Sequence, residues 1–215
     1  MSYIEIQNIT KRFDDQIVLK NVTLNLEAGK IHGIVGNNGS GKTVLMKCVC
    51  GFLQPDEGFV KVDGKTVGMD MDFPEDMGLI IETPGFLPQL SGKKNLKRLA
   101  QMKKKANEAQ IEEAMRRVEL DPNLKRPVGK YSLGMRQRLG IAQAIMEDPA
   151  LLILDEPFNG LDKNMTAKIR ELLLSLKKEG KTILLASHQQ ADIDLLCDTV
   201  WEADAGTVSL IHQSS

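Results

Sequence analysis

The 215-residue sequence has few cysteines, no long hydrophobic run and almost no net charge. Cys48, Cys50 and Cys197 lack the spacing of a metal site, so we expect reduced, buried thiols of a cytosolic protein. No apolar stretch approaches the length of about 18 residues that suggests a membrane span, and no signal peptide is visible. Work at a membrane would therefore need another chain that spans it. A net charge of −1 gives no overall attraction to nucleic acid or to an anionic membrane.

The most informative stretch is a glycine-rich sequence at residues 36–43. It reads Gly36, Asn37, Asn38, Gly39, Ser40, Gly41, Lys42 and Thr43. It follows an apolar run at residues 31–35 and opens a predicted helix that ends near residue 50, which is the setting of a phosphate-binding loop. Glycines let backbone N–H groups converge on phosphate oxygens, and the helix directs its positive end at the same anion. The Lys42 ammonium suits the β- and γ-phosphates, and the Thr43 hydroxyl suits Mg²⁺.

Apolar patterning predicts an α/β protein with a mainly parallel sheet and an antiparallel N-terminal part. Half-buried antiparallel strands are expected at residues 4–7 and 22–27, a hairpin at 60–67, buried strands at 77–81, 151–154 and 182–186, a surface helix ending at Gly180, and a closing hairpin that turns at Ala205-Gly206. Between the first two strands, residues 11–15 are predicted to form a polar loop. Its Phe13 either stacks on an adenine or fills a local core.

Residues 91–146 carry helical patterning without a strand signal, which predicts a helical subdomain inserted into the sheet protein. We expect a single domain, in which residues 1–85 and 148–215 form the core and residues 86–147 the helical part. Asn107 is a plausible N-cap of the second helix. Basic side chains without an acid among them crowd the first helix: Lys93, Lys94, Lys97, Arg98, Lys103, Lys104 and Lys105. They form either a solvated face or a docking face for an acidic partner or a weak nucleic-acid contact.

Four apolar strands each end in chemically capable residues. Val35 leads into the glycine loop, residue 81 into Glu82, residue 154 into Asp155-Glu156, and residue 186 into Ser187-His188. In open α/β sheets, ligands bind beyond the carboxyl ends of parallel strands, so parallel strands would gather these groups around one triphosphate. The pattern therefore predicts a nucleotide site at this edge.

Each of these side chains has a predicted role. Asp155 holds Mg²⁺ beside the Thr43 hydroxyl, and Glu156 acts as the general base on an attacking water. His188 contacts the γ-phosphate or holds the water and Glu156 in place. Lys42 completes the predicted catalytic set.

With these residues placed, the chain resembles the ATPase domain of the ATP-binding-cassette (ABC) family from about residue 3 to residue 210. Residues 131–138, Tyr-Ser-Leu-Gly-Met-Arg-Gln-Arg, lie where the family carries its signature, and residues 159–162 resemble the loop after the acidic pair. The resemblance implies that Phe13 stacks on the adenine and that Val44 also borders the nucleotide. It implies that Ser132 and Gly134 meet the γ-phosphate held by a second subunit, so that two Mg-ATP are sandwiched in a homodimer.

Three departures from the family pattern are visible. Leu133 and Met135 replace polar or small signature positions, and Val44 lacks a hydroxyl that often follows Thr43. Glu82 stands where the family usually has glutamine near Mg²⁺ and water. A carboxylate there binds metal more strongly but adds negative charge near phosphate, so we expect Glu82 to alter hydrolysis or its coupling without abolishing ATP binding.

The resemblance implies an ATP-hydrolysing subunit that drives a separate membrane-spanning transporter subunit from the inner face of the cell membrane. The signature variant looks like subunits of peptide-antibiotic export or immunity transporters. No nucleic-acid partner is expected. The alternatives are a soluble non-transport cassette protein that works on ribosomes or DNA, and a nucleotide-dependent switch without useful hydrolysis.

Overall fold

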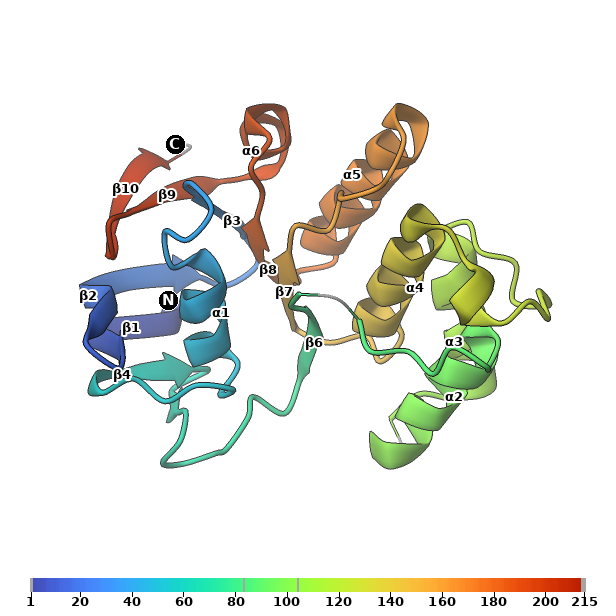
Figure 1. Ribbon diagram of the computed structural model, residues 1–215, viewed down its shortest axis with the longest axis horizontal. Coiled ribbons are helices and arrows are strands. Elements are labelled where there is room, and N and C mark those ends of the chain that lie inside the picture. Colours follow the sequence, from blue (N-terminus) through green and yellow to red (C-terminus); the bar gives the residue numbers. More distant parts are fainter. Residues whose placement is uncertain (1, 83, 104, 214–215) are drawn as a thin grey trace.

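The computed structural model describes residues 2–82, 84–103 and 105–213, and it contains two sheets with helices between them and on the far side of the second sheet (Figure 1). The first sheet is antiparallel, in the order β2-β1-β4-β5. Its strands are β1 (Ser2–Phe13), β2 (Gln16–Glu27), β4 (Glu57–Val62) and β5 (Lys65–Thr66). The predicted antiparallel strands and the hairpin at Asp63-Gly64 are confirmed.

One local prediction in this sheet is wrong. Lys11, Arg12 and Phe13 are not in a loop, because β1 continues to Phe13, which pairs with Gln16 across a two-residue turn. Asp14 in that turn has a φ of 50°, a left-handed conformation that aspartate tolerates better than most residues. Strand pairing overrides the polar composition that suggested a loop.

The second sheet has the order β10-β9-β3-β8-β7-β6. Its strands are β3 (Ile31–Val35), β6 (Met77–Ile80), β7 (Leu151–Asp155), β8 (Thr182–Ala186), β9 (Thr199–Asp204) and β10 (Thr207–Gln213). Strands β6, β7, β8, β3 and β9 run parallel, and β10 is antiparallel to β9. The expectation of a mainly parallel sheet is confirmed, and the four chemically capable strand ends lie along one edge.

The helices form where the periodicity predicts them. They are α1 (Lys42–Val49), α2 (Gly92–Lys103), α3 (Glu108–Arg117), α4 (Leu133–Ile145), α5 (Lys163–Lys178) and α6 (Gln190–Leu196), with a 3₁₀ turn at Val128–Lys130. Asn107 caps α3 in a reciprocal capping box with Gln110, as expected. The exact boundaries of a helical subdomain at residues 86 and 147 stay a prediction.

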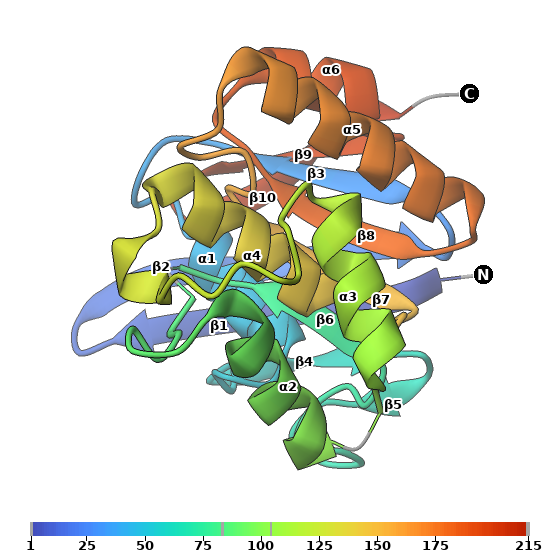
Figure 2. The same ribbon diagram turned by 90° about the vertical axis from the view of Figure 1, so that its right-hand side faces the viewer.

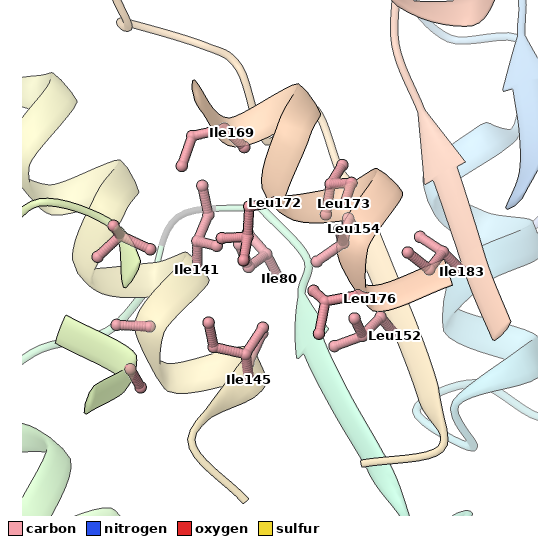
Figure 3. Close-up of a cluster of buried hydrophobic side chains, with 14 of the residues drawn as sticks. Ile80, Ile141, Ile145, Leu152, Leu154, Ile169, Leu172, Leu173, Leu176 and Ile183 are labelled. Atoms are coloured by element: carbon pink, nitrogen blue, oxygen red, sulfur yellow. The ribbon is translucent and has the colours of Figure 1, made fainter. Parts of the chain in front are cut away.

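The parallel sheet has a hydrophobic core on each face. Leu151 and Ile153 of β7 face α1 and the antiparallel sheet. Leu152 and Leu154 face the layer formed by α2, α3, α4 and α5, which we call the helical layer. Figure 3 shows the second core, where α4 and α5 pack side chains against β6 and β7. Figure 2 shows α4 and α5 lying across this face of the sheet. Since α1 packs on the other face, α1 and α4 begin on opposite sides of the sheet, near the edge at which its parallel strands end.

Two of the basic residues of α2, Lys93 and Lys97, are paired with acidic residues of α3. Lys93 Nζ lies 2.7 Å from Glu108 and 2.5 Å from Glu112, and Lys97 lies 3.0 Å from Glu108. The hydrogen bond from Lys93 is the main reason that the pKa of Glu108 falls to about 2. Lys105 donates to the Glu75 carbonyl at 2.7 Å, and Lys104 lies outside the described residues. This pairing with α3 weakens the docking interpretation of the cluster.

All three cysteines are free and buried, as expected. Burial raises the pKa of the Cys48 and Cys197 thiols to about 12 and also raises that of Cys50. Thiols held neutral in this way are poor nucleophiles and poor metal ligands. The cysteines therefore act as small core residues.

Candidate functional site

The glycine loop connects β3 to α1 in a shape that requires glycine. Gly36 has a φ of 143°, and a Cβ atom there would lie 2.2 Å from the Ala203 carbonyl oxygen of β9. Gly41, with a φ of 101°, precedes α1 and gives that helix no side-chain cap. The first-turn N–H groups of α1 are therefore left for an anion.

Two polar groups inside the loop fit a phosphate. The Lys42 ammonium donates to the carbonyls of Gly36 at 2.7 Å and Asn37 at 3.0 Å, so the side chain lies over the loop. The Ser40 hydroxyl oxygen is buried and has no hydrogen-bond partner within the described part of the chain. A buried polar atom of this kind calls for a partner, and a phosphate oxygen would supply it.

Thr43 and Asp155 meet across the sheet edge. The Thr43 hydroxyl, in the first turn of α1, donates to Asp155 Oδ2 at 2.7 Å, and Asp155 ends β7. A hydroxyl and a carboxylate are oxygen donors of the kind that Mg²⁺ prefers when phosphate and water complete its shell. The two residues therefore fit a Mg²⁺ ion bound with a nucleotide.

Glu156 and His188 form a second pair at the same edge. His188 Nδ1 lies 2.7 Å from Glu156 Oε2. The backbone N–H of Glu156 donates to the Ala186 carbonyl of β8 at 3.0 Å, and Glu156 has a φ of 50°. A left-handed conformation costs energy for a non-glycine residue and is frequent at functional sites. The predicted base and the predicted histidine are thus neighbours.

Gln137 is a site residue that our sequence reasoning missed. Its buried side-chain amide, on α4, donates to the backbone carbonyl of Glu156 at 3.1 Å. Gln137 lies inside the signature-like stretch, but its spacing gave no sign that α4 reaches the end of β7. The hydrogen bond joins the helical layer to the backbone of the predicted base.

Glu82 forms an ion pair beside the predicted metal site. Its carboxylate lies 2.5 Å from the Lys47 ammonium of α1, and its φ is 58°. Thr43 and Asp155 satisfy each other, so in this structure Glu82 pairs with a lysine rather than joining their oxygen cluster. A role for Glu82 as a metal ligand stays a prediction. Glu82 and Asp155 still border one open hollow of about 520 Å³.

Phe13 borders the nucleotide loop at the end of β1. Its ring is 43% exposed, so the alternative that it fills a local core is wrong. Phe13 lines an open hollow of about 410 Å³, together with Gly41, Lys42, Thr43 and Val44. An adjoining open cavity of about 530 Å³ is lined by Gly36, Asn37, Asn38, Glu156 and His188, among others. Stacking of Phe13 on an adenine stays a prediction that this position permits.

Ser132 and Gly134 stand at the beginning of α4. The Ser132 hydroxyl oxygen caps the helix by accepting from the Met135 N–H at 3.2 Å. A Cβ atom on Gly134 would lie 2.6 Å from the Gly160 carbonyl oxygen, so this glycine allows α4 to approach the loop after Glu156. Leu133, one of the departures from the family pattern, is 55% exposed beside them. This helix end lies in the helical layer, away from α1 (Figure 1).

Comparisons with known proteins agree with this geometry. A family model described as "ABC transporter" matches residues 19–159. The "Uncharacterized ABC transporter ATP-binding protein YybJ" of Bacillus subtilis (strain 168) is 43% identical over 94% of this chain and 93% of its own length. The "Bacitracin transport ATP-binding protein BcrA" of Enterococcus faecalis is 40% identical over 92% of this chain, which spans only 65% of that relative.

A solved structure has the same fold. It is described as the "Dimeric structure of a post-hydrolysis state of the ATP-binding cassette MJ0796 bound to ADP and Pi". It superposes with a TM-score of 0.88 over 99% of both chains, at 24% identity. Across the residues that our structure describes, no helix has the length and apolar character of a membrane span. The chain belongs to the ABC transporter family, in which it is an ATP-binding subunit.

Proposed function

We propose that this chain binds Mg-ATP in the loop at residues 36–43 and hydrolyses it with Glu156 and His188. The observation that carries the proposal is the convergence of two side-chain pairs at one sheet edge. The Thr43–Asp155 contact is 2.7 Å and the Glu156–His188 contact is 2.7 Å, and both border the glycine loop. Parallel strands present such groups together at their carboxyl ends.

The residues divide into binding and catalytic groups. The loop N–H groups and Lys42 hold the phosphates, and Phe13 and Val44 border the nucleotide. Thr43 and Asp155 hold Mg²⁺, which neutralises phosphate charge when it is bound. Glu156 orients a water and accepts its proton, and the 2.7 Å contact from His188 fixes the carboxylate for this step. General base catalysis of this kind typically contributes about 10²- to 10⁴-fold to the rate.

We also propose that two copies close head to tail around two Mg-ATP. Within one chain, α1 and α4 pack on opposite faces of the parallel sheet, so the anion-binding beginning of α4 is free to serve a second copy. Ser132 and Gly134 would then contact the γ-phosphate held by the partner's glycine loop. ATP would shift the population towards the closed dimer, and hydrolysis would release it.

A membrane-spanning partner would use this closing motion, with the chain attached to the inner face of the cell membrane. The name of BcrA refers to bacitracin transport, which supports a transporter for peptide antibiotics as the system that this chain powers. Purification with a membrane protein of several spans, and protection of cells against bacitracin, would test the partner and the substrate class. Purification with ribosomes or DNA instead would favour a soluble cassette protein.

The catalytic proposal is tested by Glu156→Gln. The substitution removes the base but keeps the size of the side chain, so turnover should fall at least about 100-fold. ATP affinity should stay within about threefold, and ATP should stabilise a dimer visible by light scattering. Glu179→Gln, the same change in a surface ion pair with Arg117, should leave turnover unchanged. Normal turnover in Glu156→Gln would overturn the assignment, and absence of hydrolysis in the parent would favour a nucleotide switch.

A further inference from the structure

A buried polar network lies directly behind His188. Its centre is Asp192, on α6, whose side chain is fully buried at 0% exposure. Its partners are Arg170, on α5, and Ser187, which is 1% exposed and follows β8. Neither Arg170 nor Asp192 has a part in the nucleotide site described above. A buried carboxylate is costly unless it is paired, so this arrangement needs a reason.

Both oxygens of Asp192 are occupied. Oδ1 accepts from Arg170 Nε at 2.8 Å and also from a terminal nitrogen of the same guanidinium. Oδ2 accepts from the Ser187 hydroxyl at 3.0 Å. The guanidinium fork therefore fixes the carboxylate, and the carboxylate fixes the direction of the serine hydroxyl.

The network reaches the two neighbours of His188. The Ser187 hydroxyl oxygen accepts from the backbone N–H of Gln189 at 3.2 Å, which closes a tight turn with His188 at its centre. The His188 side chain itself is 54% exposed and contacts Glu156 at 2.7 Å. Because the ring is in solvent, its position depends on the backbone turn that carries it.

We propose that Arg170 and Asp192 are positioning residues for ATP hydrolysis, which act by holding the Ser187–Gln189 turn so that His188 meets Glu156. The proposal rests on the role of Glu156 and His188 proposed above. Arg170 also connects this turn to α5, which begins directly after the loop at residues 159–162. The alternative is a purely structural role, in which the ion pair only stabilises the packing of α5 on α6.

A double-mutant cycle separates these two roles. Asp192→Asn keeps the shape of the side chain but removes the charge that orients Ser187. Turnover should fall about 10- to 30-fold, while KM for ATP changes less than about threefold, because the glycine loop is untouched. In a His188→Ala background, Asp192→Asn should change the residual rate by less than about twofold, because the group that it positions is gone.

Two further variants keep the test valid if Asp192→Asn folds poorly. Ser187→Ala removes only the hydroxyl of the turn and should lower turnover about three- to tenfold. Arg170→Lys keeps the positive charge but loses the two guanidinium N–H groups that contact Asp192. It should recover part of the rate lost in Arg170→Gln.

The matched control is Lys177→Gln, which breaks another ion pair of α5, with Asp198 just before β9 at 2.5 Å. It should affect thermal stability but not turnover.

The outcomes distinguish this inference from the catalytic proposal. If the parent hydrolyses ATP and His188→Ala is slow, but Asp192→Asn is as fast as the parent, only the positioning role is overturned. Equal losses from Asp192→Asn with and without His188 would also overturn it, since the effect would then not pass through the histidine. If His188→Ala is as fast as the parent, the catalytic proposal fails first.

Discussion

The beginnings of α1 and α4 are both suited to an anion, but the two helix ends are built differently. The residue before α1 is Gly41, which leaves the first-turn N–H groups without a side-chain cap. The residue before α4 is Ser132, whose hydroxyl oxygen already accepts from the N–H of Met135. Around α1 the chain gathers Lys42, the Thr43–Asp155 pair and the Glu156–His188 pair, whereas α4 begins in the helical layer without them.

This difference supports the proposal that the α1 end binds the nucleotide with Mg²⁺, and that the α4 end acts only on a phosphate held by a neighbouring copy. The α4 end offers a hydroxyl and N–H groups, but the lysine that would add charge lies on the other side of the sheet. Each of the following predictions changes one of these regions or the contacts between them.

The largest effect is expected for Gly36→Ala. The new Cβ would lie 2.2 Å from the Ala203 carbonyl oxygen, and a φ of 143° strains any side chain, so the loop must deform. ATP affinity should fall at least about 100-fold, measured with a fluorescent nucleotide. Gly39→Ala is the matched control, because nothing lies within 4 Å of its new Cβ and only the strain of its φ of 82° remains. An equal loss in both variants would contradict the contact with Ala203.

A smaller and different effect is expected for Ser132→Ala. Binding of ATP to the isolated chain should stay within about twofold, because the α1 site is intact. Turnover, and the ATP-dependent dimer in a Glu156→Gln background, should fall about tenfold, because one anion ligand is lost across the interface. Ser91→Ala at the beginning of α2, where Ser91 Oγ accepts from the Lys94 N–H, is the control and should leave turnover unchanged. Loss of ATP binding by the monomer would contradict the division of roles.

Glu82 connects α1 to the segment that leads into the helical layer, and a moderate effect is expected there. Glu82→Gln should raise turnover about two- to fivefold, because it removes a negative charge near the phosphate site, with ATP affinity unchanged. Lys47→Met should act in the opposite direction, because it leaves the Glu82 carboxylate without its counter-ion. Rates measured over a range of Mg²⁺ concentrations would test both. Identical rates and metal dependence in parent and variants would remove any role for Glu82.

The smallest effects are two separate losses of stability in acid. His32, in the strand before the glycine loop, has a pKa below its usual 6.5, chiefly because it is buried, although its ring contacts Thr199 and Glu27. The unfolded chain therefore binds the extra proton first, and stability falls as the pH drops below about 6.5. Glu108 in the helical layer, with its pKa of about 2, contributes stability that is present above pH 4.5 and lost as the pH falls through 2.

Chemical denaturation at several pH values checks this pair of windows. His32→Gln should flatten only the change that begins as the pH drops below about 6.5, and Glu108→Gln only the change below about pH 4.5. A variant that flattened neither window would show that its group does not titrate as its surroundings suggest.

Much of the fold followed from local patterns. The run at residues 151–154 is apolar at each position because β7 is buried on both faces, and this made it recognisable without any structure. Asn107 was recognised as a cap because its chemistry is local. Glu156 and His188 were predicted as site residues from strand ends alone, since the carboxyl ends of parallel strands share one edge.

The one error concerns a local strand pairing, whereas the omissions involve contacts between residues distant in sequence. Phe13 was assigned to a loop because its neighbours are polar, whereas pairing with β2 decides its conformation. Gln137 reaches Glu156 across 19 residues of sequence, and Lys47 reaches Glu82 across 35. Such partners have no spacing rule, because they depend on how α4 and α1 pack against the sheet.

Residue types at short, fixed spacing were enough to predict the phosphate loop, the order of strands and helices along the chain, and the family. The contacts between side chains became visible only in the folded chain: Glu82 with Lys47, Gln137 with the Glu156 backbone, and Arg170 with Asp192 behind His188. The physical reason is that the pairing of buried polar groups depends on where helices pack, and helix packing is set by the shape of the two cores rather than by any local pattern.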